Sequence, residues 1–438
     1  MKEKLDNEVS RRTFLKGTAA AGAFLLGPGV PYIAKRAWAE EENKMGWHGP
    51  YPYKPPVAGF NEQYENAKIL KTYGKSNAEE IRGLVPDVMI EWLKDPVKWG
   101  PFYVNEMEYI KYVPTPGYVE ATNKYKGTCK LAKDGNLLNW VAGLPFENPQ
   151  NGWEVAWNYE KRCSPDDYSS KAVTIINERG TEKRFNRLSS RRLWMVGRTT
   201  LDPKPVYPND KGLELLDATP FSDPNDLRGM VNLYHRYVDR YKADDMWLYI
   251  PTMRRIRRMS TAQRMDSIGG GSDATWDDFL NFSGKMMQYD WKLIERRDAL
   301  LPTMAKGKPE WVVGRHLSGV NDRYRRLKGT YIVECIPKDP NHIYSKKILW
   351  VDPESFHSPY GEFYDRKGKL WKIWHFHIAF DSKGGFYPCA MTLLDIQRMH
   401  SSNTVIWGMS GNDGWTEEMY TWSYLEKVSI NQMYPRPM

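Results

Sequence analysis

Cysteine is scarce in this sequence, and no two cysteines lie close together. The 438 residues include four, Cys129, Cys163, Cys335 and Cys389. The C-x-x-C spacing of attached haem groups and thioredoxin-like redox pairs is absent. Four cysteines allow two disulfides in three pairings, or four free buried thiols. Proximity favours Cys129–Cys163 and Cys335–Cys389, and we expect the second pair in particular because both residues fall in the expected β region.

Long apolar runs and internal repeats are also missing. After residue 39, no uncharged apolar run approaches the roughly 20 residues that a membrane-spanning helix needs. No segment recurs at a fixed length, which argues against propeller and solenoid architectures. The sequence therefore predicts one large domain or two ordinary ones, with no membrane span after residue 39.

Recognisable catalytic motifs are missing too. Gly269-Gly270-Gly271 lacks the strand–loop–helix setting of a phosphate loop, and we interpret it as a hinge or a bulge. Gly408-Met409-Ser410-Gly411 lacks the glycine spacing of a nucleophile elbow. The adjacent carboxylates of Asp277 and Asp278 would point apart. We therefore identify no catalytic residues and no cofactor, and the sequence favours a non-catalytic protein while leaving open whether it is an enzyme.

The N-terminus carries the three regions of an export signal. The paired arginines Arg11 and Arg12 precede Phe-Leu-Lys, and an uncharged apolar run follows from Thr18 to Gly27. Ala37-Trp38-Ala39 then offers the small residues that a signal peptidase accepts. Paired arginines select the twin-arginine route. We expect cleavage after Ala39 and a mature protein in the periplasm, without a lipid anchor because no cysteine lies near that site.

Charge and aromatic content describe the mature chain. Residues 1–39 hold seven Lys or Arg and three Asp or Glu, so their removal lowers the net charge from +9 to +5. This modest value and the compartment both disfavour a nucleic-acid partner. The 18 Trp and 27 Tyr residues fit either an aromatic β-sheet core or an aromatic-lined binding cavity.

The segment before residue 118 is expected to be irregular and helical. Residues 40–75 are rich in Pro, Gly, Tyr and Asn and predict a surface arm. A helix should open after Ser76, kink or split at Pro86, and end at Asp95-Pro96. Residues 103–113 are interpreted as a second helical or mixed stretch.

From residue 118 onward, strand-like runs punctuated by turn residues predict an antiparallel β domain. We expect the division 1–39 signal peptide, 40–117 N-terminal extension, and 118–438 β domain with a C-terminal extension. A short helix is expected at Trp276–Leu280 and a hairpin turn at Asp365–Gly368. The clearest expected strands are residues 172–177, 192–196, 229–238, 246–250, 330–336, 347–351, 362–365 and 370–380.

Several short sequence patterns follow one another along the chain in a fixed order. They are Asn139-Trp140-Val141-Ala142-Gly143-Leu144-Pro145-Phe146, Ala156-Trp157-Asn158, Asp226-Leu227-Arg228-Gly229, Asp245 to Pro251 with Arg254 to Arg258, Ser272-Asp273 with Trp276 to Phe279, Lys347 to Asp352, and Phe363 to Gly368. As an ordered set over about residues 100–400, they resemble a bacterial domain-of-unknown-function family labelled "outer membrane lipoprotein-sorting protein". That family is related in fold to the periplasmic lipoprotein carriers LolA and LolB.

The resemblance implies a mainly β fold. It implies an open, curved antiparallel half-barrel like that of LolA and LolB, with covering helices and an apolar groove. It implies a non-catalytic periplasmic carrier for a lipid, a lipoprotein acyl chain or a sterol-like molecule, linked to outer-membrane transport. Its partners would be that ligand and a membrane transporter or outer-membrane protein.

Alternation in two strands suggests which side chains form the groove. In residues 246–250, Met246, Leu248 and Ile250 share one face, and Trp247 and Tyr249 share the other. Both faces are apolar or amphipathic, so either could line a cavity or lie under covering helices. The proposed ligand-binding residues are the aromatic Trp247, Tyr249, Trp276, Trp291 and Trp374, with the basic Arg254, Arg255, Arg257 and Arg258 near the mouth. These arginines could equally form ion pairs with Asp244, Asp245, Asp273, Asp277 and Asp278.

Two histidines support an alternative function. His375 and His377 share one face of their strand and could begin a metal site of a periplasmic metalloenzyme. A third ligand would come from His342, His357, Asp352 or Glu362. None of these has diagnostic spacing, so hydrogen-bonded structural histidines remain the simpler interpretation.

Overall fold

The computed structural model describes residues 66–100, 102–260, 262–304, 311–312, 319–320, 323–381 and 385–422. All of these fall within one unit defined by internal contacts, Gly49–Pro435. The expected signal peptide, its cleavage site at Ala39 and most of the expected arm lie outside the described residues. The arm's end is described: it contributes a strand, β1 (Ile69–Tyr73).

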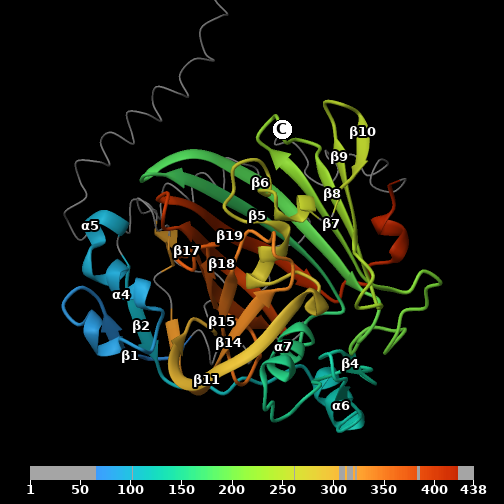
Figure 1. The fold of residues 1–438 in the computed structure, drawn as a ribbon, viewed down its shortest axis with the longest axis horizontal. Coiled ribbons are helices and arrows are strands. Elements are labelled where there is room, and N and C mark those ends of the chain that lie inside the picture. Colours follow the sequence, from blue (N-terminus) through green and yellow to red (C-terminus); the bar gives the residue numbers. More distant parts are fainter. Residues whose placement is uncertain are drawn as a thin grey trace, which may run out of the picture. The chain divides into compact units, whose positions relative to one another are not determined.

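One large curved sheet of fifteen strands dominates the described part of the chain (Figure 1). The strand order is β1-β2-β14-β15-β16-β17-β18-β19-β5-β6-β7-β8-β9-β10, and β11 also pairs with β14. Neighbouring strands are antiparallel except β2 and β14, which are parallel. After β1, the strands are β2 (Val104–Met107), β5 (Asp167–Glu178), β6 (Thr181–Trp194), β7 (Leu213–Asp223), β8 (Val231–Tyr237), β9 (Asp245–Ile250), β10 (Arg255–Arg258), β11 (Tyr289–Leu301), β14 (Arg323–Pro337), β15 (Lys346–Val351), β16 (Tyr360–Tyr364), β17 (Leu370–Asp381), β18 (Gly385–Asp395) and β19 (His400–Gly411). The expected open, mainly β architecture is confirmed.

Short elements surround this sheet. Two small two-stranded sheets pair β3 (Lys130–Leu131) with β4 (Leu137–Leu138) and β12 (Trp311–Val312) with β13 (Gly319–Val320). The helices are η1 (Ala78–Ile81), α4 (Asp87–Lys94), α5 (Pro96–Trp99), α6 (Pro116–Lys124), α7 (Gly152–Glu160), η2 (Ala262–Met265), η3 (Trp276–Asn281), η4 (Met286–Gln288) and η5 (Glu417–Tyr420).

The first helical region follows the sequence prediction. Pro86 separates η1 from α4 because a proline inside a helix removes one backbone donor and clashes with the preceding turn. Asp95 ends α4 and caps α5, where its side chain accepts a hydrogen bond from the backbone N–H of Lys98 at 2.9 Å. The expected short helix at residue 276 is η3, and the expected hairpin turn at Asp365 joins β16 to β17.

Residues 103–113 contain no helix, and four of them form the strand β2, Val104–Met107. β2 pairs with β1 on one side and with β14 on the other. The N-terminal extension therefore contributes two strands to the main sheet. The expected division at residues 117/118 remains a prediction about folding units.

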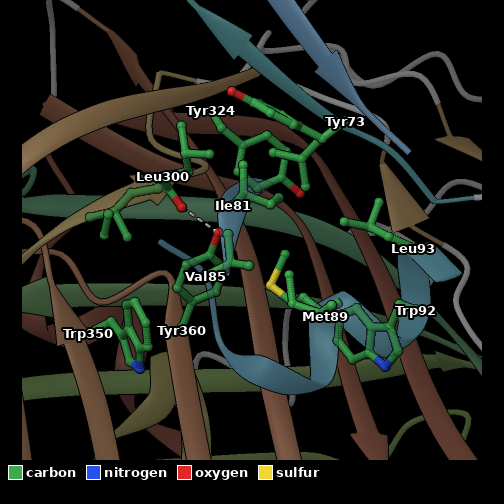
Figure 2. Packing of buried hydrophobic residues seen from close by; sticks show 14 of the residues in the cluster. Tyr73, Ile81, Val85, Met89, Trp92, Leu93, Leu300, Tyr324, Trp350 and Tyr360 are labelled. Carbon is green, nitrogen blue, oxygen red and sulfur yellow. Dashed lines mark hydrogen bonds between the residues drawn. The ribbon is translucent and has the colours of Figure 1, made fainter. Parts of the chain in front are cut away.

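Other parts of the chain cover both faces of the sheet. We call the face that carries Trp374 and Met246 the groove face, and the opposite face, with Ile373 and Trp247, the outer face. On the outer face, η1 and α4 pack against β14–β17 through a buried cluster that includes Ile81, Met89, Trp92, Tyr324 and Tyr360 (Figure 2). Two-sided burial explains why these strands are apolar on both faces.

The expected disulfides are wrong for every cysteine whose side chain is described. Cys129, Cys163 and Cys335 are free thiols. Cys335 lies on β14 and Cys389 on β18, and three strands separate β14 from β18 in the sheet. Strands about 4.8 Å apart place the two backbones far beyond the roughly 7 Å limit for a disulfide. Burial instead raises the pKa of the Cys335 thiol.

Candidate functional site

A cavity lies between the groove face and a segment that crosses it. The space between the protein atoms there is about 950 Å³ when the open solvent at its mouth is counted, so the enclosed part is much smaller. Strands β5–β9 and β17–β19 form its floor, and residues 264–283 form its roof. We call residues 264–283, yellow in Figure 1, the covering segment. The lining residues are Ser170, Ala172, Thr174, Leu188, Ser190, Arg192, Asp217, Thr219, Asn232, Tyr234, Met246, Arg264, Ile268, Ser272, Ala274, Trp276, Phe279, Ser283, Trp374, Met391, Leu393, Ser402, Thr404 and Ile406.

One end of the cavity is mainly apolar. Trp374 on β17 lies opposite Leu393 on β18 in the sheet register, and Met391 is two residues before Leu393 on the same face. The indole of Trp374 stacks on Phe376 with ring centroids 4.9 Å apart and an interplanar angle of 6°. Ala274 of the covering segment belongs to the same buried cluster. We call this side the apolar end.

The other end is polar and is formed by β5–β8. Across these strands, Ser170 lies opposite Ser190, and Thr219 lies opposite Asn232. The neighbouring row contains Arg192 opposite Asp217 and Asp217 opposite Tyr234. We call these two rows the polar end. The cavity is therefore amphipathic along the direction that crosses the strands.

Opposite charges neutralise each other at the polar end. Arg192 Nε donates to Asp217 Oδ2 at 3.0 Å, and both side chains are largely buried. Burial raises the pKa of Asp217 above its usual value, although the charge of Arg192 opposes this effect. Arg264 Nε donates to Asp277 Oδ1 at 2.6 Å. Its guanidinium also lies over the ring of Tyr234, 5.0 Å from the centroid.

The covering segment is tied to the sheet near Asp273. The Asp273 carboxylate accepts hydrogen bonds from Ser402 Oγ and His400 Nδ1, both at 2.8 Å. Lys372 Nζ donates to the backbone carbonyl of Asp273 at 2.6 Å. The hydrogen bond with Asp273 raises the pKa of His400. These contacts hold the roof over β17 and β19.

A second, fully buried anchor lies at Asp278. Lys347 Nζ donates to Asp278 Oδ1 at 2.9 Å, and the Tyr344 hydroxyl donates to Oδ2 at 2.7 Å. Both charged side chains have 0% exposure. Burial by itself would raise the pKa of the Asp278 carboxyl, but the positive charges of Lys347 and Lys372 hold this pKa below its usual value. The roof is therefore fixed by an ion pair in the interior.

The triple glycine lies in the covering segment. Gly269, Gly270 and Gly271 have φ angles of +62°, +63° and +112°, which L side chains rarely adopt. A Cβ on Gly269 would come within 2.9 Å of Asn186 and 3.0 Å of Phe221. The motif is a tight turn that brings the roof against β6 and β7.

The structure places only two of the expected aromatic residues in the cavity. Trp276 lies in the roof, and Trp374 lies in the floor. On β9 it is Met246 that lines the cavity. Trp247 and Tyr249 are on the outer face, where Trp415, Tyr420 and Trp422 of the C-terminal segment pack in the same cluster. The sequence left open whether these two side chains line the cavity or lie under a covering segment, and in the structure they lie under the C-terminal segment.

The other expected ligand-binding residues lie elsewhere. Trp291 belongs to a separate cluster under α7, and its Nε1 donates to the Met286 carbonyl at 3.2 Å. The four arginines lie in the β9–β10 hairpin at the edge of the sheet, where Arg254 forms part of the turn. The others are on exposed β10, and Arg258 pairs with Asp245.

The two histidines of the proposed metal site are buried among aromatic rings on the outer face. The His375 imidazole stacks between Tyr324 and Tyr360, with centroids 6.0 and 5.5 Å away. Its Nε2 is 3.1 Å from the Tyr324 hydroxyl. Burial lowers the pKa of His375 to about 3 and that of His377 well below its usual value.

The candidate third ligands of that metal site have other partners. Asp352 pairs with buried Arg325, and Glu362 accepts a hydrogen bond from Tyr364. The rings of His342 and His357 pack against Tyr289 and Phe380. Within the described ranges, no three His, Cys, Asp or Glu side chains are grouped so that they could hold a metal.

The polar end was not predicted from the sequence. Arg192, Asp217, Asn232 and Tyr234 meet only when β6, β7 and β8 pair, and β7 was not predicted. Pro220 within β7 hides that strand, because proline is usually excluded from central strands. The usable signal is the alternation of apolar and polar residues from Leu216 to Thr219, shortly before the predicted strand at residues 229–238.

Comparisons with known proteins give a related protein of Pseudomonas aeruginosa and several solved structures. Uncharacterized protein PA3922 is 26% identical over 293 residues, covering 63% of this chain and 62% of that protein. This chain therefore matches under two thirds of the length of that relative. A domain of a proposed outer membrane lipoprotein-sorting protein from Vibrio parahaemolyticus is 21% identical with a TM-score of 0.47, covering 63% of this chain and 98% of that one.

Two further solved structures are similar at lower identity. A DUF1329 family protein from Desulfovibrio piger is 19% identical with a TM-score of 0.46, covering 62% of this chain and 96% of that chain. The LolA superfamily protein NE2245 from Nitrosomonas europaea is 16% identical with a TM-score of 0.40, covering 63% and 100%.

Two family models match the sequence itself. The twin-arginine translocation signal model matches residues 8–26, so the chain is exported to the periplasm as predicted. Among the described helices, none has the length and apolar character needed to cross a membrane. The model "Protein of unknown function (DUF1329)" matches residues 74–425, which is most of the chain, and this protein therefore belongs to the DUF1329 family.

Proposed function

We propose that this protein is a periplasmic carrier or binding protein for an apolar or amphipathic molecule. The ligand would be a lipid, a lipoprotein acyl chain or a sterol-like compound. The observation that supports this function is the cavity between the groove face and the covering segment. It is lined by Trp276, Trp374, Met391 and Leu393 at positions where a solid core would otherwise be expected.

Burial of the ligand supplies the binding energy in this proposal. Binding is stabilised by about 25 cal/mol for each Å² of apolar surface that is removed from contact with water. An acyl chain or a ring system could therefore bind without any catalytic group. Trp276 and Trp374 would contact the ligand directly, whereas Trp247 and Tyr249, on the outer face of β9, would stabilise the sheet without taking part in binding.

Export to the periplasm and the sequence resemblance to the lipoprotein-sorting family support a link to the outer membrane. In this role the protein would receive its ligand from one membrane, or deliver it to one, together with a transporter or an outer-membrane protein. The exposed arginines of the β9–β10 hairpin could contact an acidic partner or anionic headgroups.

Native mass spectrometry of the protein purified from the periplasm tests this function. We expect a co-purifying organic molecule that is lost on extraction with solvent. Ala172→Phe should fill the cavity floor and abolish this mass, because Ala172 lines the cavity and is 3% exposed. Ala243→Phe adds the same side chain at an exposed site and should retain it.

Three results would argue against the proposal. The first is a stoichiometric metal with no organic ligand. The second is an Ala172→Phe protein, folded with an unchanged melting temperature, that still binds the molecule. The third is a delipidated wild type with no affinity for fatty acids, phospholipids or sterols in a tryptophan-fluorescence titration.

A further inference from the structure

The polar end contains a buried acceptor that no described residue satisfies. Asn232 lines the cavity and is 1% exposed. Its Nδ2 lies 3.4 Å from the Trp247 carbonyl, but its Oδ1 has no hydrogen-bond partner in the described part of the chain. A buried acceptor without a partner destabilises the folded protein, because it has lost its hydrogen bonds to water. A bound molecule that donates a hydrogen bond would remove this destabilisation.

A buried donor at the same end is also unsatisfied. Arg264 is 7% exposed, and its Nε and Nη2 donate to Asp277 Oδ1 and the Ser283 carbonyl. Its Nη1 has no partner among the residues described. The polar end therefore offers one acceptor and one donor to whatever occupies it.

The charges at this end are already balanced. Arg192 pairs with Asp217, and Arg264 pairs with Asp277. An anionic group placed here would bring an additional buried charge without a counter-charge, which is costly at low dielectric. A neutral polar group avoids that cost.

Hydroxyl side chains line the remainder of the polar end. Ser170 and Ser190 face each other across β5 and β6, and Thr219 faces Asn232 across β7 and β8. A hydroxyl rotates to donate or to accept, so Ser170 can match a ligand hydroxyl in either role. Thr219 Oγ1 donates to Asp217 Oδ1 at 3.2 Å, so it offers a ligand its oxygen as an acceptor. These hydroxyl side chains cannot supply a countercharge.

From these observations we infer that the cavity takes a neutral amphiphile whose polar end carries hydroxyl groups. A ligand hydroxyl donates to Asn232 Oδ1, and a hydroxyl oxygen accepts from Arg264 Nη1. The apolar body of the ligand extends toward Trp374, Met391 and Leu393. This inference rests on the proposed carrier function and specifies the ligand chemistry of the same cavity.

Three probes with the same alkyl chain length test the inference. They are 1-monopalmitoylglycerol, which is neutral with two hydroxyls, palmitate, which is anionic, and hexadecane, which has no polar group. Affinities for the delipidated full-length mature protein are measured by displacement of a fluorescent apolar probe. We expect monopalmitoylglycerol to bind at least about tenfold more tightly than palmitate or hexadecane. A tenfold difference in affinity corresponds to about 1.4 kcal/mol of binding free energy.

Variants then assign the effect to the polar end. Asn232→Leu should weaken monopalmitoylglycerol binding about tenfold and leave hexadecane binding unchanged. Thr219→Val, a smaller change in the same row, should weaken it less. Asn225→Leu makes the same substitution as Asn232→Leu at an exposed site and should have no effect. The ranking on wild type decides the question even if Asn232→Leu does not fold.

The outcomes separate this inference from the proposed function. Palmitate binding more tightly than monopalmitoylglycerol would overturn the neutral-ligand inference while retaining a lipid carrier. Equal affinity for all three probes would mean that the polar end does not recognise the ligand. Failure of every probe to bind, in a folded protein, would overturn the carrier function itself.

Discussion

Strand β17 has a packed face and a hollow face, although the side chains on both are largely apolar. On the outer face, His375 lies among Trp92, Phe102, Tyr324 and Tyr360, with ring centroids 5.5 to 6.3 Å away. On the groove face, Trp374 lines a cavity. One face is packed and the other borders a cavity because different segments of the chain cover them.

The outer face is covered by helices, and the groove face by a turn-rich segment. The helix α4 presents Met89, Ile90, Trp92 and Leu93 as one buried side that fits directly onto the strands (Figure 2). The covering segment has only short 3-10 turns and is fixed at Asp273 and Asp278, so it bridges the strands without filling the space beneath. Apolar composition alone therefore does not separate core from binding site.

The largest expected effect comes from the packed face. Trp92→Ala should lower the free energy of unfolding by about 3–5 kcal/mol, because it removes a fully buried indole in contact with Phe102. Ligand affinity of the remaining folded protein should be unchanged. Denaturant unfolding measures the first quantity, and Val97→Ala, at a site 75% exposed, is the control. A loss below 1 kcal/mol would show that the outer face is not the packed one.

The anchor of the roof should give the next largest effect. Asp278→Ala leaves the Lys347 ammonium buried without its partner and should cost about 3 kcal/mol or more. Hydrogen exchange should also increase in residues 264–283. Asp266→Ala, an exposed position in the same segment, should change neither. Unchanged exchange in the Asp278 variant would contradict the anchoring role.

Several of these elements could be predicted from local sequence, and others could not. Pro86 and Asp95 determine the helix boundaries by backbone chemistry that acts within a few residues, so both were predicted correctly. The two-sided character of β17 was also visible in its alternation. The faces of β9 could not be assigned, because Met246 and Trp247 are both suitable for burial.

The polar end and the thiols depend on long-range pairing. Ser190 meets Ser170, and Asn232 meets Thr219, only through the register of four strands, which no local pattern encodes. Strand order cannot be read from local sequence either, and for this reason the predicted pairing of Cys335 with Cys389 was wrong. Sequence order placed these cysteines near each other, whereas β15, β16 and β17 lie between their strands.

On the groove face, a substitution should affect binding as well as folding, because Trp374 lines the cavity and also packs on Phe376. Trp374→Ala should weaken the binding of an apolar ligand about tenfold, because part of the indole surface that would cover it is lost. Trp247→Ala on the outer face of β9 should lower stability but leave affinity unchanged. Tryptophan-fluorescence or probe-displacement titrations of both folded variants measure this. Equal loss of affinity in the two would break the distinction between the faces.

A pH dependence of similar size is expected on the packed face. Glu362 on β16 lies opposite Ile348 and Ile373, and burial raises the pKa of its carboxyl to about 7. Tyr364, which donates a hydrogen bond to it at 3.1 Å, only partly opposes this. As the pH rises, the unfolded state, in which this carboxyl has a pKa of 4.5, therefore loses its proton at a lower pH than the folded state does. Stability from this group is greatest below pH 4.5 and falls as the pH rises toward 7.

Glu362→Gln should remove that dependence because an amide does not ionise. Between pH 5 and pH 8, the wild type should lose about 1–2 kcal/mol relative to the Gln variant, after allowance for the partial solvent access of the side chain. Denaturant unfolding at both pH values measures the difference, with Glu178→Gln at an exposed site as the matched control. If the wild type and the Glu362→Gln variant changed in parallel with pH, the carboxylate would be ionised in the folded protein, and this part of the outer face would be hydrated rather than packed.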